Sequence, residues 1–199
     1  SWSQIATGFS GNFNTVNIIN ETEIIISSSN SILKSSDGGL TWTSISIPNS
    51  TVNKTFFVTP LIGHAACNNG TMLKTIDGGT SWYTTQSSNS IPSNLFTVYF
   101  INQNVGFYTK EHSDMYKTID GGETWSKVNG ISDAIYALSF VNENIGYATG
   151  EYGVVFKTID GGTTWHWVSF QNGRYGSTSM YGIHFLDNNT GYATGTRGR

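Results

Sequence analysis

Short stretches in which apolar and polar residues alternate recur along the whole chain. In Gly182–Asp187, for example, the apolar residues Ile183 and Phe185 flank the polar His184. A period of two over so short a length predicts a half-buried β-strand. A glycine-led segment such as Gly146–Gly150 follows each of these stretches, and a third apolar segment that ends in lysine comes after it.

A nine-residue motif follows the third segment four times. It reads K-S-S-D-G-G-L-T-W at Lys34–Trp42, K-T-I-D-G-G-T-S-W at Lys74–Trp82, K-T-I-D-G-G-E-T-W at Lys117–Trp125 and K-T-I-D-G-G-T-T-W at Lys157–Trp165. The four aspartates are 40, 43 and 40 residues apart. A fourth short strand begins at each tryptophan, so each period predicts one four-stranded antiparallel blade of a β-propeller.

Each position of the motif has a physical reason. The glycines permit the positive φ that a tight turn requires, the aspartate accepts hydrogen bonds from the N–H groups of the turn, and the tryptophan offers a large apolar surface for packing. The single aspartate in each blade's motif supplies too few oxygen ligands for a calcium-binding loop of the EF-hand kind. We therefore expect a structural role for Asp37, Gly39, Trp42, Asp77, Gly79, Trp82, Asp120, Gly122, Trp125, Asp160, Gly162 and Trp165.

The motif resembles the Asp-box, also called the bacterial neuraminidase repeat. The wider pattern, in which N-x-x-x-G-Y-A-T-G precedes an apolar segment and K-T-x-D-G-G-x-T-W, is similar to the photosystem II assembly and stability factor family of propellers. The resemblance covers essentially the whole chain and is least clear in the second repeat, where Thr59–Cys67 replaces the usual form. It implies an all-β propeller fold and says little about function, because sialidases, xyloglucanases and sortilin-type receptors also contain Asp-boxes.

The repeat spacing predicts a single propeller over residues 1–199, with blades at about 8–47, 48–88, 89–130, 131–171 and 172–199 and an N-terminal strand at 1–7. Trp2 precedes Trp42 by 40 residues, as the tail of a further copy would, and the last repeat stops before its third strand. Two arrangements fit: a five-bladed ring whose last blade lacks a strand, or five blades of a larger ring of six to eight. We favour the larger ring, because a missing strand leaves an unpaired sheet edge.

Composition excludes several classes of protein. Charged residues are 12% of the chain and the net charge is −3 with ten basic residues, which gives no field that would hold nucleic acid. The single cysteine, Cys67, lies in an apolar stretch and is expected to be a core residue; it rules out an intrachain disulfide and a cysteine zinc site. No apolar run is long enough to span a membrane.

Sequons for N-glycosylation occur at Asn20, Asn49, Asn53, Asn69 and Asn188.

The histidines carry no metal-ligand spacing, so we expect neither a metal site nor a cofactor. His64 and His184 lie within strand patterns and are expected to be core or sheet-face residues, and His166 lies between Trp165 and Trp167 at the rim.

The irregular loops are where a ligand is expected, because function on a repeat scaffold resides in departures from the repeat. The resemblance implies that ligands bind on the face opposite the Asp-boxes, which the second-to-third and fourth-to-first connections build. The most polar of these loops spans Lys110–Asp114, and a long one spans Gln171–Ser179. The candidate binding residues, which could equally be a solvated rim, are Lys110, Glu111, His112, Asp114, Glu151, Tyr152, Arg174, Tyr175 and Arg197.

We expect a non-catalytic interaction module that binds protein or glycan through this face. Its composition fits secreted or cell-surface proteins, with the periplasm and the thylakoid lumen as alternatives, and its partners would include other domains or blades of the same parent chain. A role like that of a photosystem II assembly factor is one alternative. The resemblance implies that such a factor binds a reaction-centre precursor through a basic patch, whereas all three arginines here lie in the last 26 residues.

A glycosidase is the enzymatic alternative. A sialidase needs arginines from separate blades to clamp a carboxylate, and no arginine precedes Arg174. A xyloglucanase-like enzyme needs two carboxyl groups, for which Glu111 or Asp114 together with Glu151 are the candidates.

Overall fold

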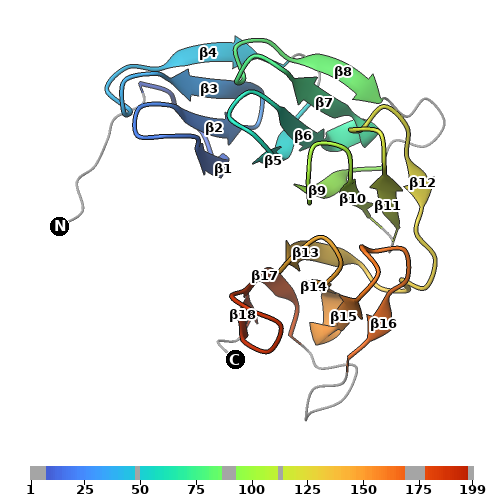
Figure 1. The fold of residues 1–199 in the computed structure, drawn as a ribbon. Helices are drawn as coiled ribbons and strands as arrows, with labels where there is room; N and C mark the ends of the chain where they lie inside the picture. Colours follow the sequence, from blue (N-terminus) through green and yellow to red (C-terminus); the bar gives the residue numbers. More distant parts are fainter. Residues whose placement is uncertain (1–7, 48–49, 87–92, 112–113, 169–177, 197–199) are drawn as a thin grey trace. The chain divides into compact units, whose positions relative to one another are not determined.

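The computed structural model describes residues 8–47, 50–86, 93–111, 114–168 and 178–196 (Figure 1). It is all-β, with two short 3-10 turns, and within each sheet the strands that follow one another in sequence are neighbours. The chain divides into two compact units, residues 1–98 and 99–199. The predicted N-terminal strand at 1–7 lies outside the described residues, as does any pairing of Ser1 with Arg199.

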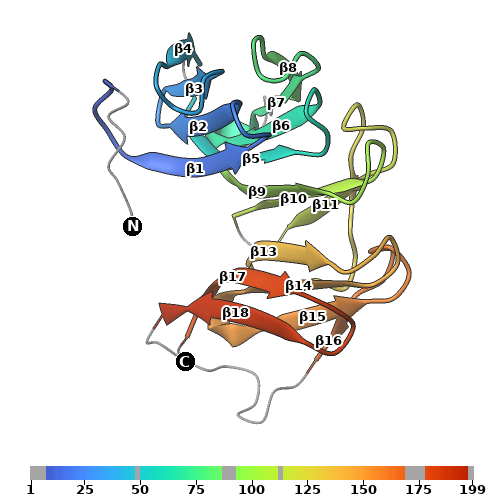
Figure 2. The same ribbon diagram turned by 60° about the vertical axis from the view of Figure 1, so that its left-hand side comes forward.

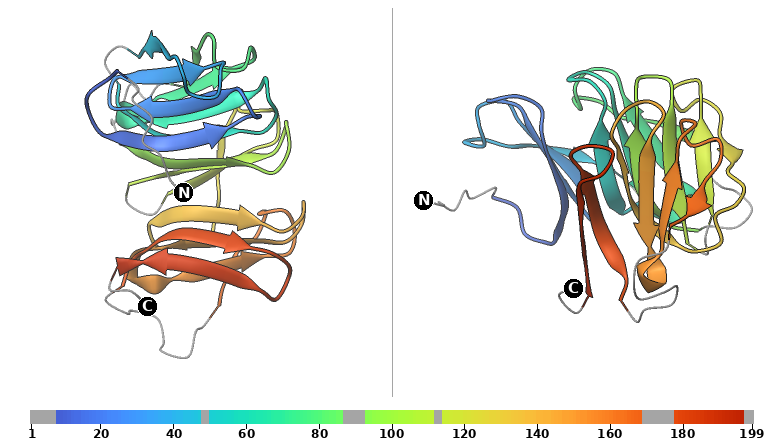
Figure 3. Two further views of the ribbon diagram at one scale, coloured as in Figure 1. Left: turned by 90° about the vertical axis from the view of Figure 1, so that its left-hand side faces the viewer. Right: turned by 60° about the horizontal axis from the view of Figure 1, so that its bottom comes forward.

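The first unit contains two four-stranded sheets, each a simple meander. The first consists of β1 (Phe13–Ile18), β2 (Ile24–Ser28), β3 (Ser31–Ser35) and β4 (Thr43–Ser46), and the second of β5 (Val52–Phe57), β6 (Gly63–Cys67), β7 (Met72–Thr75) and β8 (Tyr83–Gln86). The 3-10 turn η1 (Asn68–Gly70) joins β6 to β7. β1 lies beside β5, so the two sheets pack face against face through their first strands (Figure 3).

The second unit repeats this plan, beginning with a strand that starts at the end of the first unit. One sheet consists of β9 (Leu95–Phe100), β10 (Gly106–Lys110), β11 (Met115–Thr118) and β12 (Ser126–Lys127), and the next of β13 (Ile135–Phe140), β14 (Gly146–Gly150), β15 (Val155–Thr158) and β16 (His166–Trp167). The turn η2 (Glu151–Gly153) joins β14 to β15. The last described strands, β17 (Met180–Phe185) and β18 (Gly191–Gly195), form a two-stranded sheet beside β13 (Figure 2). The prediction of an all-β protein built of four-stranded antiparallel blades is confirmed.

Buried apolar residues form a core in each unit. Ile25, Ile32, Val52 and Ala65 are fully buried in the first. Cys67 belongs to the same core, and burial raises the pKa of its thiol to about 12, which keeps it protonated.

In the second unit, the ring of Trp165 packs edge-on against Phe107 of the preceding sheet and Phe140 of its own. Gly162 has a φ of 77°, and a side chain there would collide with the Phe107 ring. The tryptophan of the motif therefore ties neighbouring sheets together and also anchors its own first strand.

The aspartate of each Asp-box holds the turn between the third and fourth strands. In the third repeat, Asp120 Oδ1 accepts hydrogen bonds from the N–H groups of Glu123 (3.1 Å) and Thr124 (2.9 Å) and from the Thr118 hydroxyl (2.7 Å). The Thr124 hydroxyl donates to Oδ2. These bonds, led by that of the Thr124 hydroxyl, lower the pKa of Asp120 well below its usual range. Asp37, Asp77 and Asp160 make the corresponding bonds in their repeats.

We predict that Asp120→Ala lowers the free energy of unfolding by about 1–3 kcal/mol, because two turn N–H groups lose their acceptor. Asp120→Asn keeps a carbonyl oxygen at that place and costs less. Chemical denaturation followed by tryptophan fluorescence measures both. Ile119→Ala, at a position 74% exposed in the same motif, is the control and changes stability by less than about 0.5 kcal/mol. Equal losses in the Ala and Asn variants would refute the proposed role of the acceptor oxygen.

His64 is fully buried in β6, where the repeat has Phe107 or Tyr147 at the same position. It lies opposite Lys74 in the ladder. Burial first, and then the positive charge of Lys74, lowers the pKa of His64 to about 3. The folded protein therefore holds a neutral imidazole where the unfolded chain, with an ordinary pKa near 6.5, takes up a proton.

We predict that stability falls as the pH drops below 6.5, because only the unfolded chain binds that proton between pH 6.5 and 3. The loss between pH 7 and 5 is about 2 kcal/mol. His64→Phe removes this loss, since nothing at that site then titrates. His184→Phe, at an exposed position of β17, is the control and keeps the acid sensitivity of the natural chain. Urea denaturation at pH 7 and pH 5 measures the difference, and an unchanged slope in His64→Phe would contradict the prediction.

Candidate functional site

The loop face of each unit is the end of the sheets opposite the Asp-boxes. Each Asp-box lies where a third strand ends, so the connection into that strand and the connection leaving the fourth strand lie at the other end of the blade. The Asp-box end is regular: the Gly38, Gly78, Gly121 and Gly161 N–H groups each donate to a carbonyl of the first turn of their own sheet. The loop face is where the repeats differ.

The candidate residues between β10 and β11 are engaged with one another and with nearby rings. The Lys110 N–H donates to the Asp114 carbonyl (2.8 Å), and the Lys110 ammonium lies 4.7 Å from the centre of the Tyr116 ring. The Asp114 carboxylate pairs with Lys127 of β12. That hydrogen bond and charge raise the pKa of Lys127. Glu111 is partly buried in the loop between them.

Glu151 and Tyr152 lie in η2, in the second unit. The Glu151 N–H donates to the Ala134 carbonyl (2.9 Å), which fixes the turn against the start of β13. Tyr152 has a φ of 56° and is 46% exposed. A left-handed backbone at a residue other than glycine costs energy and is concentrated at functional sites. His112, Arg174, Tyr175 and Arg197 lie outside the described residues.

The corresponding turn of the first unit, η1, has the same geometry with a different chemistry. Asn69 is left-handed, with a φ of 59°. The Asn68 N–H donates to the Thr51 carbonyl (2.9 Å), and the Asn68 side chain accepts a bond from Asn53 (2.7 Å). These two turns contain the only described residues other than glycine with a positive φ.

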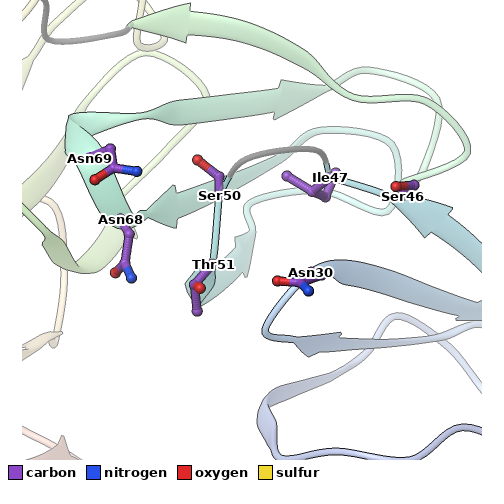
Figure 4. A pocket seen from close by; sticks show the side chains of 7 residues that line it. All are labelled: Asn30, Ser46, Ile47, Ser50, Thr51, Asn68 and Asn69. Atoms are coloured by element: carbon purple, nitrogen blue, oxygen red, sulfur yellow. The ribbon is translucent and has the colours of Figure 1, made fainter.

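A pocket of about 440 Å³ opens beside η1 (Figure 4). Asn30 reaches it from the β2–β3 turn of one sheet, whereas Asn68 and Asn69 reach it from the next sheet. Its lining consists of Asn30, Ser46, Ile47, Ser50, Thr51, Asn68 and Asn69. Side-chain amides and hydroxyls therefore dominate its wall, and none of these side chains is ionisable.

A β-bulge at the start of the first strand also shapes this face. The pairing skips one residue in β1, β5, β13 and β17, and the skipped residues are Asn14, Asn53, Tyr136 and Tyr181. A bulge redirects its extra residue. Asn14 and Asn53 each donate to a carbonyl of the next first strand, at Val52 (2.7 Å) and Leu95 (2.8 Å). Tyr136 and Tyr181 instead stack on each other, with ring centres 5.1 Å apart.

Sequence analysis did not select Asn30, Asn53, Tyr136 or Tyr181 as binding candidates. For Asn53, Tyr136 and Tyr181 the signal is positional, because the skipped residues are two asparagines in the first unit and two tyrosines in the second, at one place of the repeat. Asn30 has no such signal. In the described part of the chain, no group of three or more histidine, cysteine or acidic side chains could hold a metal ion, and no helix is long and apolar enough to cross a membrane.

Comparisons with known proteins agree with this geometry. Residues 51–119 match the family model described as photosynthesis system II assembly factor YCF48. A search of curated proteins found no match.

Three solved structures are similar in fold. A structure of YCF48 bound to D1 peptide is 18% identical with a TM-score of 0.68, over 90% of this chain and 58% of that chain. YCF48 from Cyanidioschyzon merolae is 16% identical in sequence with a TM-score of 0.73, and the match covers 93% of this chain and 64% of that chain. The GH74 xyloglucanase from Xanthomonas campestris is 12% identical with a TM-score of 0.63, and the match covers 82% of this chain and 31% of that chain.

The chain thus spans about three fifths of the length of the two YCF48 chains and a third of the xyloglucanase. These structural neighbours include both an assembly factor and a xyloglucanase, so the likeness establishes a fold and no activity. The resemblance predicted from the sequence is confirmed: the protein has the fold of a BNR-type, Asp-box β-propeller.

Proposed function

We propose that the chain is a non-catalytic interaction module of a secreted or cell-surface protein and binds a peptide segment of a protein partner on its loop face. The observation that carries this proposal is the pocket beside η1, whose wall of amides and hydroxyls both donates and accepts hydrogen bonds. An extended peptide presents the same alternation of N–H and carbonyl groups. A pocket of this volume is within the range of known ligand sites, roughly 300–1,000 Å³.

The backbone around the pocket supports a preformed site. The Ile47 N–H donates to the Asn30 carbonyl, and the Asn68 N–H to the Thr51 carbonyl, both at 2.9 Å. Asn53 holds the Asn68 side chain in place. A site whose walls are already ordered loses little conformational entropy when a ligand binds.

The acids of the loop face support binding over catalysis. Asp114 is paired with Lys127, and a lysine beside a carboxylate does not supply the second carboxyl group that glycoside hydrolysis requires. Glu151 lies near Tyr136, and its charge contributes to the raised pKa of that tyrosine after burial, the larger cause. The alternative, a fragment of a xyloglucanase-like glycosidase, draws on the likeness to GH74 enzymes and would use Glu151 with Glu111 or Asp114.

The likeness to YCF48 favours a protein ligand over a glycan. One of the similar structures is YCF48 bound to D1 peptide, and the matched family is an assembly factor. A chaperone of that kind, in the thylakoid lumen, is the second candidate function.

We predict that Asn30→Ala weakens binding to a peptide ligand about fivefold, because it removes one amide that donates and accepts at the pocket. Asn30 is exposed, so the variant keeps its fold. The ligand is selected from a peptide array and its affinity is measured by calorimetry. Leu40→Ala, at a position 82% exposed on the Asp-box turn, is the control and binds like the natural chain.

Three outcomes would overturn the proposal. A glycan array that gives ligands where the peptide array gives none would assign the pocket to carbohydrate. Hydrolysis of xyloglucan that Glu151→Gln abolishes would make the protein an enzyme. Peptide binding that Asn30→Ala leaves unchanged would move the ligand away from the pocket.

A further inference from the structure

The connections at the loop-face end of the first unit carry no charged residue. They lie at 28–31 between β2 and β3, 46–52 between β4 and β5, 68–71 between β6 and β7, and 86–94 between β8 and β9. None of these residues is aspartate, glutamate, lysine, arginine or histidine. Because this is a matter of residue identity, it also holds for positions 48–49 and 87–92, which lie outside the described residues.

The fold itself does not require this neutrality. The corresponding connections of the second unit contain charged residues at the same places of the repeat: Glu111 and Asp114 between β10 and β11, Asp133 between β12 and β13, and Glu151 between β14 and β15. The absence of charge is therefore a property of the first unit's own sequence.

The pocket beside η1 lies within this neutral surface, and amide groups order its surroundings. The Asn53 side chain donates to Asn68 Oδ1 (2.7 Å) and to the Leu95 carbonyl (2.8 Å). The Asn69 N–H donates to the side-chain oxygen of Asn94 (3.4 Å). Neutral hydrogen bonds thus connect the wall of the pocket to the start of the next sheet.

The lysines that are nearest in sequence to the pocket do not line it. Lys34 lies on β3, where its ammonium pairs with Glu23 (3.5 Å) and donates to the Thr80 hydroxyl (3.1 Å) of the neighbouring Asp-box. Lys54 is exposed on β5 and is not among the residues of the wall. The wall consequently offers a ligand dipoles and no charge of either sign.

We propose that this pocket takes an uncharged stretch of the partner peptide, held through its main-chain amides and neutral polar side chains, and discriminates against an acidic or basic residue at that place. The inference rests on the proposed function in one respect, that the ligand is a peptide, and it names the class of segment that the pocket selects.

The cost of desolvation is the physical reason for this selection. A charge that enters a pocket loses part of its hydration, which costs free energy unless an opposite charge replaces the water. An amide or hydroxyl group instead exchanges its bonds with water for similar bonds with the side-chain amides and hydroxyls of the wall. A charged segment is therefore rejected by what the wall lacks, which is one way in which binding sites achieve specificity.

The first test uses the full chain and a peptide array in which charged and uncharged residues are equally frequent. Array peptides whose binding Asn30→Ala weakens are made again with glutamine, glutamate or lysine at each position in turn. Calorimetry measures their affinities. We expect at least one position at which glutamate and lysine each bind about tenfold more weakly than glutamine.

A second test places a charge in the wall. Asn30→Asp replaces an exposed amide of the pocket by a carboxylate of the same size. We expect it to raise the affinity of the lysine-substituted peptide about threefold or more and to lower that of the glutamate-substituted peptide. Leu40→Asp is the matched control: it adds the same charge at a position 82% exposed on the Asp-box turn of the same sheet, where the third repeat has Glu123, and it changes neither affinity.

Thermal unfolding of each variant shows whether it is folded. Asn30-dependent peptides in which glutamate or lysine binds as well as glutamine at every position would refute this inference and leave the proposed function intact. An equal gain for the lysine peptide in Leu40→Asp would assign the effect to the overall charge of the protein instead of the pocket. An array without any Asn30-dependent peptide would overturn the proposed function, and this inference with it.

Discussion

The hydrogen bonds of the Asp-box aspartate are the interaction on which each sheet depends. Four strands of two to six residues cannot bury much apolar surface, so the turn between the last two must be held by polar contacts. In the third repeat one carboxylate accepts bonds from two turn N–H groups and two hydroxyls. The turn is also bonded to the first turn of its own sheet. Because the Asp-box holds that end of the blade, the residues at the opposite end can differ from one repeat to the next.

The variation at the loop face follows from one structural device, the bulge at the start of the first strand. A skipped residue points away from the ladder, and its identity then decides what the face offers. In the first unit the residue is asparagine, which bonds to the next strand and helps to order the amide-lined pocket. In the second unit it is tyrosine, and the rings stack beside an acid. One backbone device therefore gives a neutral polar surface in one unit and an aromatic, acidic one in the other.

The sequence predicts the fold well and the binding surface poorly, for physical reasons. The Asp-box is a local motif whose hydrogen bonds join residues at most four positions apart, so the turn at Asp120 can be predicted directly from the sequence. A strand prediction, by contrast, rests on strict alternation, and a bulge breaks alternation by one residue. The alternation therefore does not reveal Tyr136 and Tyr181. It does not reveal the pocket either, because the walls come from two sheets and from positions as far apart in sequence as Asn30 and Asn68. Gly70 and Gly153 mark the turns η1 and η2 in the sequence, but they do not predict that Asn69 and Tyr152, the residues before them, are left-handed as well.

The distribution of acids is the reason why we propose recognition and not catalysis. A catalytic carboxyl group has to exchange a proton during the reaction, which requires a pKa near the working pH. The repeat does the opposite to its aspartates: in Asp37 and Asp77, hydrogen bonds from turn hydroxyls and N–H groups lower the pKa to about 2. On the loop face, Asp114 is engaged with a lysine and Glu151 with aromatic rings. The acids of the loop face thus lie beside a cation and beside a ring, and this placement is the support that they give to the proposed binding role.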